Sequence, residues 1–463
     1  MNRLLAAAPI DRLAQFVSAL DYDAIPEAAV AKAKIHIADT LAAAIAGARS
    51  GEFALTLKAM LPVGATRVWG TNLAGSPRDA ALINGVAAHA FELDDSGGCD
   101  HSGAVIMPAV FSALRETTGP VDGRRLITAV VAGYDAGRRL LEATGGYDAH
   151  NKLGWHSTGT CGTFASAAAV ANLLGLDAAA TRDAMTLATS FSSGLWAFIH
   201  DGSQAKKLHA GRAAEGGLLA ARLAAQGYAG PSRVFDEVWG GFFTSFNKSA
   251  CQPELLSEGL GAVWKVNRAV LKPYASCRGA HSAVDALEDL LTETGHAPED
   301  IARIGLRMSS MLADMCGAKA AGAMAPTQMS LPFALAARCV FGTAGLQAYP
   351  EERRGHPAIQ AMMERIDISV DASMDAMAEP LVTLTFSDGL FVERMVPRAT
   401  GSAERPMSPA AVAAKFRELA AMSLPEDRVE MLWQRLGGLE EVCDCTEIEA
   451  LMTGHAETLP TFR

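Results

Sequence analysis

Segments rich in alanine and leucine, with helical periodicity, fill most of residues 9–265, and this pattern limits the possible folds more than any other feature. The first places Leu13, Phe16, Val17 and Leu20 on one face of a helix. Aromatic residues make up only 6% of the chain, and glycine occurs 43 times. Because small side chains let helices approach closely, the sequence predicts a tightly packed helical core.

Further helices are predicted where the same composition recurs, often opened by proline or closed by glycine. They cover residues 26–47, 79–92, 104–116, 124–143, 161–174, 179–197 and 208–226.

The pattern changes after about residue 268. Residues 301–310 and 381–396 alternate like strands, and Ser387-Asp388-Gly389 within the second segment predicts a hairpin turn. Helical patterns at 281–294, 327–341 and 356–364 lie between or beside these strands, and helices return within 408–452.

The predicted fold is therefore mainly α, with a large all-helical domain and a smaller α+β lid domain inserted before the C-terminal helices. The helical domain comprises residues 1–267 and 404–463, and the lid comprises residues 268–403.

A formal net charge of −11, without a basic stripe, argues against nucleic acid or an anionic membrane as partner. The apolar run at the N-terminus is too short for a secretory signal, and no apolar stretch reaches the roughly 20 residues of a membrane span. A cytoplasmic protein is expected. The eight cysteines contain no CxxC pair, so neither a disulfide framework nor a metal cluster is expected.

The stretch "FELDDSGGCDHSGAV" (91–105) concentrates Glu92, Asp94, Asp95 and His101 among small and apolar residues. By itself it fits a metal site, an acid–base loop or an acidic turn between helices. His156 precedes Ser157 and Thr158, which can cap the following helix, so it is either a functional histidine or part of a helix start.

Lys206 and Lys207 occupy the first turn of a predicted helix if Ser203 is its cap. Cations there oppose the helix dipole, but a bound anion would reverse that penalty. The alternative is a solvated basic face.

Polar residues also gather where the lid domain begins, a usual place for a ligand cleft: Lys272, Tyr274, Cys277, Arg278 and His281. Cys277 is either a nucleophile or an inert buried thiol, and Phe333 is either cleft wall or core. If the cationic groups of these stretches converge, they form a positive pocket suited to a small di- or tricarboxylate.

Taken in order, the stretches "NGVAAHAFELDDS", "HSGAVIMPAV", "GWHSTGTCGTFASAAAVANLLGL", "GSQAKKLHAGRAAEGG" and "KPYASCRGAHSAVDAL" resemble the MmgE/PrpD family. The family includes 2-methylcitrate dehydratases, cis-aconitate decarboxylases and iminodisuccinate epimerases. The resemblance implies a homodimer, a site between the helical domain and the lid, and chemistry that needs no cofactor.

The resemblance also assigns roles. His101 is expected to transfer the proton, with His156 as its partner or as a carboxylate ligand, while Asp94 orients the substrate and Lys206 and Lys272 bind its carboxylates. The expected substrate-binding residues are Glu92, Asp95, Ser96, Lys207, Tyr274, Cys277, Arg278, His281 and Phe333.

This sequence departs from the family pattern at three places. His101 is followed by serine rather than proline, Cys277 stands where the animal cis-aconitate decarboxylases have a histidine, and Phe333 replaces a common tyrosine. The first two departures look more like the fungal cis-aconitate decarboxylases.

All family reactions can pass through a carbanion or enolate beside a carboxylate. We expect a lyase, with 2-methylcitrate-type dehydration preferred and cis-aconitate-type decarboxylation or epimerisation as alternatives. A carboxylate-binding protein without activity, and a metal hydrolase built on Asp94, Asp95, Cys99 and His101, are the rivals from other classes.

Overall fold

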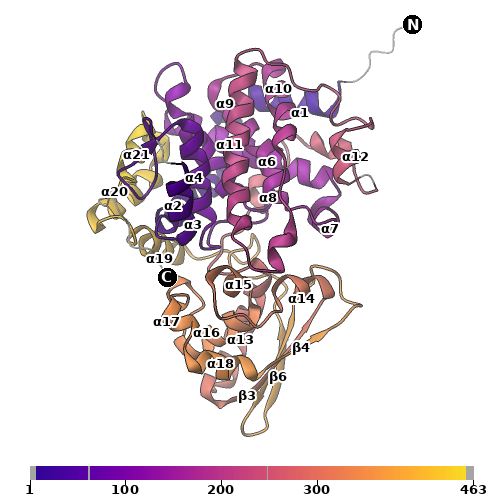
Figure 1. The fold of residues 1–463 in the computed structure, drawn as a ribbon, viewed down its shortest axis with the longest axis vertical. Helices are drawn as coiled ribbons and strands as arrows, with labels where there is room; N and C mark the ends of the chain where they lie inside the picture. The colour runs from indigo at the N-terminus through magenta and orange to yellow at the C-terminus, as the bar shows by residue number, and fades with distance from the viewer. Residues whose placement is uncertain (1–6, 61–62, 248, 455–463) are drawn as a thin grey trace.

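The computed structural model describes residues 7–60, 63–247 and 249–454, which form two parts. The upper part in Figure 1 is helical, and the lower, smaller part combines helices with a sheet. The predicted class, mainly α with a smaller α+β part, is confirmed.

Twelve helices of the larger part precede residue 250: α1 (Pro9–Ala19), α2 (Glu27–Gly47), α3 (Gly51–Met60), α4 (Pro77–His89), α5 (Ser102–Ser112), α6 (Gly123–Ala143), α7 (Gly146–Lys152), α8 (Ser157–Thr160), α9 (Gly162–Leu174), α10 (Ala178–Ala188), α11 (Ala205–Ala225) and α12 (Phe242–Phe246). Short strands β1 (Thr66–Arg67) and β2 (Ala74–Gly75) pair antiparallel. Short 3-10 helices occur at Tyr22–Ala24, Leu114–Glu116, Thr189–Phe191, Trp196–Ile199, Pro253–Leu256, Lys265–Arg268, Arg278–Ala280, Pro298–Asp300, Leu346–Ala348 and Leu439–Glu441.

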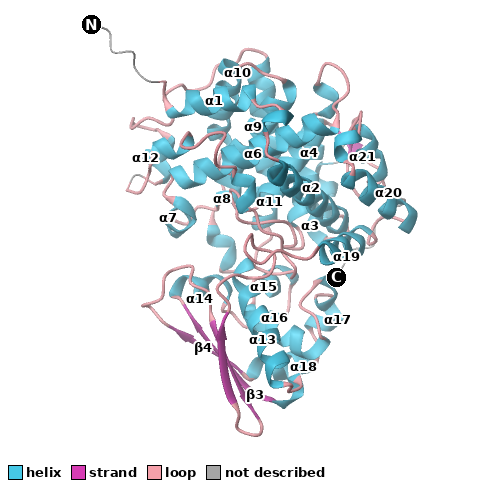
Figure 2. Ribbon diagram, turned by 180° about the vertical axis from the view of Figure 1, so that it is seen from behind, coloured by secondary structure: helices cyan, strands magenta, loops and turns pink. Residues whose placement is uncertain are grey.

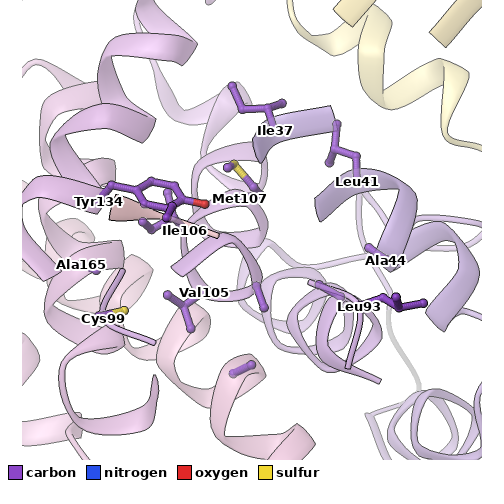
Figure 3. Close-up of a cluster of buried hydrophobic side chains, with 14 of the residues drawn as sticks. Ile37, Leu41, Ala44, Leu93, Cys99, Val105, Ile106, Met107, Tyr134 and Ala165 are labelled. Atoms are coloured by element: carbon purple, nitrogen blue, oxygen red, sulfur yellow. The ribbon is translucent and has the colours of Figure 1, made fainter. Parts of the chain in front are cut away.

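Helices α4, α5, α6, α9 and α11 pack against one another at the centre of this part. The cluster in Figure 3 includes Leu93, Cys99 and Tyr134, so the polar loop that follows α4 is anchored in the core. Glycines permit the closest helix crossings: a Cβ on Gly85 of α4 would lie 2.8 Å from the Gly211 Cα of α11.

The smaller part contains a four-stranded sheet of order β4-β3-β5-β6, formed by β3 (Ile301–Met308), β4 (Ile366–Val370), β5 (Leu381–Phe386) and β6 (Phe391–Met395). Strand β3 pairs parallel with β4 and antiparallel with β5. Strands β5 and β6 form the predicted hairpin, and Gly389 in its turn has a φ of 90°. The accompanying helices are α13 (His281–Thr294), α14 (Ser310–Cys316), α15 (Met324–Gln328), α16 (Leu331–Phe341), α17 (Glu351–Arg354) and α18 (Pro357–Glu364).

The chain then returns to the larger part through α19 (Pro409–Ala420), α20 (Glu426–Gly437) and α21 (Thr446–Leu451). Helices α19 and α20 pack on α2, so the two ends of the sequence share one core, as the yellow and indigo segments of Figure 1 show. Among the helices of the described residues, none has the length and hydropathy that a membrane crossing requires.

Three local expectations were wrong. The helix predicted at 179–197 ends at Ala188, where the chain passes into 3-10 turns. Strand β4 lacks a clear alternating pattern and was not predicted. Helix α11 begins at Ala205 with Gln204 rather than Ser203 as its N-cap, so Lys206 and Lys207 lie one position closer to the helix start.

Candidate active site

A cavity of about 400 Å³ is lined by residues of both parts. Figure 2 shows loops between the two parts at its centre. The larger part lines it with residues that include Glu92, Ser96, Asp100, His101, Arg138, Tyr147, Trp196 and Lys206, and the smaller part and its connecting segment with Arg268, Lys272, Cys277, Arg278, Met315 and Met377. The cavity therefore needs both parts of the molecule.

The loop between α4 and α5 supplies most of the polar wall. Its residue Ser96 pairs with Val270 in an antiparallel bridge, through hydrogen bonds of 3.0 and 2.7 Å, and so fixes the loop to the segment that enters the smaller part. Gly97 has a φ of 83°, and a Cβ there would lie 2.6 Å from the Arg268 carbonyl oxygen. Glycine is required at this close contact.

Glu92 binds three ammonium groups within the protein. Lys206 Nζ donates to its two carboxylate oxygens at 2.7 and 2.8 Å, Lys272 Nζ donates at 3.2 Å, and Lys207 also donates to it. Burial alone would raise the pKa of the Glu92 carboxyl, but the lysines outweigh burial and hold the pKa well below its ordinary value. One carboxylate thus leaves a surplus of positive charge beside the cavity.

Asp94 links two adjacent histidines, with rings tilted by 50° to each other, behind the cavity wall. Its oxygens face His89 Nδ1 at 2.9 Å and His101 Nδ1 at 3.0 Å, and the two rings are 4.1 Å apart. His101 Nδ1 also lies 2.9 Å from the Asp95 carbonyl oxygen. With acceptors on this side, Nδ1 carries the proton, and Nε2 is the nitrogen available on the other side of the ring.

A second histidine pair lies next to His101. The Nδ1 atoms of His156 and His209 are 2.9 Å apart, and His156 Nε2 is 3.5 Å from an Asp100 oxygen. Burial lowers the pKa of His156 to about 4 and that of His209 to about 3, so both rings are neutral near pH 7.

The smaller part contributes cations and a thiol. Arg278 lines the cavity and forms an ion pair with Glu379. A hydrogen bond from the Cys316 thiol, together with Lys206, lowers the pKa of the Cys277 thiol to about 6 against the effect of burial. Cys277 therefore reaches the thiolate form more readily than a free cysteine.

Of the residues predicted from sequence, seven line this cavity: Glu92, Ser96, His101, Lys206, Lys272, Cys277 and Arg278. Asp94 contacts His101 of this set from behind, and His156 contacts Asp100, another lining residue. The remaining five lie elsewhere. Asp95 accepts hydrogen bonds from Tyr134 and the Gly103 N–H, and Lys207 lines a smaller neighbouring cavity.

The other three are packing residues in this structure. Tyr274 donates a 2.7 Å hydrogen bond to Asp285, and His281 Nε2 lies 3.3 Å from the Ser276 carbonyl oxygen. Phe333 is fully buried, with its ring 5.0 Å from that of Tyr349. A substitution of tyrosine by phenylalanine at this position therefore removes no hydroxyl from the cavity wall.

The sequence assigned no role to His89, Asp100 and His209 of the charged and histidine clusters, nor to several lining residues: Arg138, Tyr147, Asp148, Trp196, Arg268, Met315 and Met377. His89 precedes Glu92 by three residues, the spacing that joins neighbours on a helix, and this was the available signal. Nothing local distinguishes His209 from a surface histidine, because its partner His156 lies 53 residues away.

Two sets of donors within the described residues have ligand atoms within 4.8 Å of one another: His89–Asp94–His101 and Asp100–His101–His156. In the first set, the two Asp94 oxygens already face His89 Nδ1 at 2.9 Å and His101 Nδ1 at 3.0 Å. The second borders a cavity lined by Lys206 and Lys272, whose charge opposes a further cation. Both sets serve better as hydrogen-bonding clusters than as metal sites.

The arrangement combines an oriented imidazole with buried cations in one cavity. Cations hold carboxylates and stabilise negative charge that develops on a neighbouring carbon, and an imidazole transfers protons near neutral pH. This combination suits proton transfer at a carbon beside a carboxylate.

Comparison with known proteins agrees with this chemistry. The chain is 29% identical to the cis-aconitate decarboxylase-like protein oryM of Aspergillus oryzae, with 96% of each chain covered. It is 29% identical to a cis-aconitate decarboxylase of Aspergillus terreus, with 95% of each covered, and 25% identical to the human cis-aconitate decarboxylase, with 92% of this chain and 90% of the human protein covered.

Family models give the assignment. The model of the MmgE/PrpD N-terminal domain matches residues 11–254, and the model of the C-terminal domain matches residues 274–436. The two matches include every polar residue of the cavity named above except Arg268 and Lys272, which lie between them. The chain belongs to the MmgE/PrpD family.

Proposed function

We propose that this protein is a lyase that removes a carboxyl group as CO2 from a small unsaturated tricarboxylate of the cis-aconitate type. The observation that carries the proposal is the position of His101: its Nδ1 is held by Asp94 and the Asp95 carbonyl, and the residue lines a cavity that also contains Lys206 and Lys272. A proton donor and carboxylate-binding cations thus border the same volume.

The cations take the binding role. Lys206 and Lys272 contact Glu92, which holds their ammonium groups at the cavity wall, and Arg278 adds a guanidinium from the smaller part. A tricarboxylate would bind to this surplus charge through charge-assisted hydrogen bonds.

The reaction then needs one proton. The bond to the departing carboxylate breaks and CO2 leaves, while the electron pair stays on the substrate and is delocalised toward a remaining carboxylate. His101 donates its proton to the carbanion, and solvent later returns a proton to the imidazole. Lysine ammonium groups beside the substrate stabilise the negative charge during this step.

The named activities of the relatives support decarboxylation, because the fungal and human proteins are similar over nearly the full chain. Dehydration of a 2-methylcitrate-type acid is the second candidate, since it passes through the same type of intermediate and the family resemblance includes it. An epimerase would also use His101, but it needs a residue that returns the proton to the opposite face.

Proton NMR in D2O distinguishes these reactions. The protein is incubated separately with cis-aconitate, 2-methylcitrate, citrate and iminodisuccinate. Decarboxylation is expected to give CO2 and a product carrying one deuterium at carbon. Loss of water without CO2 would support dehydration, deuterium exchange without loss would support epimerisation, and binding without turnover would support a carboxylate-binding protein.

The central residue is tested by His101→Gln. We expect kcat to fall by at least about 10²-fold, the usual contribution of a positioned acid or base, while the circular dichroism spectrum stays unchanged. His150→Gln is the matched control, because His150 is also buried but contacts Thr160 outside the cavity. Near-normal turnover in His101→Gln would refute the assignment.

We further propose that the reaction needs no metal or cofactor and that the protein is a cytoplasmic homodimer. Activity should survive dialysis against a chelator, and light scattering should give about twice the chain mass of 48.4 kDa. Loss of activity that zinc or iron restores would contradict the first proposal, and a monomer mass would contradict the second.

A further inference from the structure

Asp100 has an unusual backbone conformation for a residue with a side chain. Its φ is 105°, and among the described residues only Glu92 shares a positive φ without being glycine. L-residues are strained in this region, and such strain persists where the surrounding structure requires that side chain. Gly97 and Gly98 precede it by three and two positions, so the same loop uses glycine elsewhere but has aspartate at this strained position.

The Asp100 side chain, on the cavity wall, lies between His101, which also lines the cavity, and His156 behind it. One carboxylate oxygen is 3.8 Å from His101 Nε2, and the other is 3.5 Å from His156 Nε2. Thr158 Oγ1 donates to the second oxygen at 3.4 Å. The carboxylate thus spans two rings whose centres are 6.2 Å apart.

His101 therefore has oxygens on both sides of its ring, with acceptors at Nδ1 and a carboxylate at ion-pair distance from Nε2. Asp94 Oδ2 and the Asp95 carbonyl face Nδ1 at 3.0 and 2.9 Å, and Asp100 faces Nε2. At 3.8 Å the Asp100 carboxylate is beyond hydrogen-bond range but at ion-pair distance, where an anion stabilises the charged imidazole relative to the neutral ring. The geometry therefore favours the imidazolium form.

The other charged and titratable groups around His101 oppose or do not change this preference. Lys272 is the opposing cation, and His89 and His156 are neutral because burial lowers the pKa of each. Burial lowers the pKa of His101 too, but Asp100 and then Asp94 outweigh burial and Lys272, and the pKa is raised.

We propose that Asp100 is a positioning residue that holds His101 as a protonated imidazolium at the cavity, so that His101 enters the reaction as the proton donor rather than as a base. This inference rests on the proposed function and deepens it. A donor is what decarboxylation requires, because CO2 departs without prior removal of a proton from carbon.

Asp100 also gives His101 and His156 different protonation states. Its second oxygen lies 3.5 Å from His156 Nε2, which favours the tautomer with the proton on Nε2, and His156 Nδ1 then accepts from His209 Nδ1 at 2.9 Å. His156 is then a neutral ring oriented by its two neighbours, while His101 is the charged ring.

Asp100→Asn is the decisive variant, because asparagine keeps the shape, tolerates a positive φ and carries no charge. Asp148→Asn is the matched control: Asp148 also lines the cavity, but within the described residues it forms no hydrogen bond or ion pair with either histidine. The readouts are the pH dependence of kcat/KM and, independently of turnover, the titration of His101 in protein labelled with ¹⁵N-histidine, assigned with His101→Gln.

We expect Asp100→Asn to lower kcat by about tenfold or more with a KM within about threefold. Removing an anion near His101 lowers its pKa, so the alkaline limb of kcat/KM should move to lower pH by at least one unit, and the NMR titration should move with it. Asp148→Asn should leave both midpoints unchanged.

A His101 titration that is the same in wild type and Asp100→Asn overturns the inference, as does an equal shift in Asp148→Asn. The two proposals fail separately. Suppose that the wild type turns over none of the four acids while the His101 titration midpoint is still raised and still falls in Asp100→Asn. In that case the proposed reaction fails and the assignment of Asp100 stands.

Discussion

Two buried ion clusters differ in their balance of charge. The difference distinguishes a cluster that can bind a ligand from one that only stabilises the fold. Glu92 contacts Lys206, Lys207 and Lys272 beside the cavity. Asp135 and Arg139, one turn apart in α6, form a pair with Nε to Oδ2 at 2.5 Å and no exposure to the cavity.

In the second cluster the charges of Asp135 and Arg139 cancel, and both side chains are occupied by contacts within the protein. Arg139 also donates to the carbonyl oxygens of Glu258, Gly259 and Val263, and Asp135 accepts from the Lys265 N–H at 2.9 Å. These bonds attach α6 to the 258–265 segment. One carboxylate paired with one guanidinium leaves no net charge for a ligand. One carboxylate paired with three ammonium groups leaves a positive charge that can bind an anion.

The largest expected effect tests the balanced cluster. Arg139→Met leaves the Asp135 carboxylate buried without its cation, which should lower the free energy of unfolding by about 3–5 kcal/mol. Urea denaturation followed by circular dichroism measures this. Arg303→Met, which removes an exposed partner of Asp367, is the control and should change little.

The turnover of Arg139→Met, measured per folded molecule, should equal that of the wild type. A variant with normal stability and reduced turnover would show that this cluster also serves the reaction, and the distinction between the clusters would be lost.

The next effect tests the unbalanced cluster. Lys272→Met removes a cavity cation but leaves Glu92 paired with Lys206 and Lys207. We expect kcat/KM to fall by about 10²- to 10³-fold with little loss of stability, because the lost charge acts on substrate and intermediate.

Lys207→Met is the matched comparison, since Lys207 also binds Glu92 but lines only the neighbouring cavity. Its kcat/KM should fall by less than about tenfold. Equal losses in the two variants would mean that the lysines act by fixing Glu92 and not by contact with substrate.

A smaller effect extends the comparison to histidines. Burial lowers the pKa of His150 to about 4, from an ordinary value of 6.5. The unfolded chain then binds a proton at higher pH than the folded chain, so the stabilising contribution is full above pH 6.5 and is lost as pH falls from 6.5 to 4.

His150→Gln should therefore reduce the loss of unfolding free energy between pH 6.5 and 4 by up to about 2–3 kcal/mol. Urea midpoints across this range measure the slope. The pH profile of turnover should stay as in the wild type, because His150 contacts Thr160 and not the cavity; an altered profile would place His150 in the reaction.

Local pattern predicted much of the fold. The helix at Pro9–Ala19 and the hairpin around Gly389 follow from periodicity and turn chemistry, which act between near neighbours in the chain. Strand β4 escaped prediction because it pairs at the edge of a sheet, and only one of its five residues is buried: Asp367, Ser369 and Val370 are exposed, and Ile368 is partly buried. Its partner β3, and not its own pattern, makes it a strand.

The candidate site was likewise predictable only in part from the sequence. His101, Lys206 and Lys272 were identified from sequence as polar residues among small or apolar neighbours, and the structure places all three at one cavity. Phe333 and His281 come from stretches with the same character, yet they are packed in the smaller part. Composition shows where a polar or aromatic residue is unusual, but it does not show which way the side chain points.

The sequence by itself determined the helical class, the family and a short set of chemically capable residues. Only the tertiary structure decided that Glu92 meets lysines 114, 115 and 180 residues away, and that Asp100 lies between His101 and His156. The physical reason is range: helix and turn preferences depend on residues within a few positions, whereas a shared cavity depends on how distant helices pack.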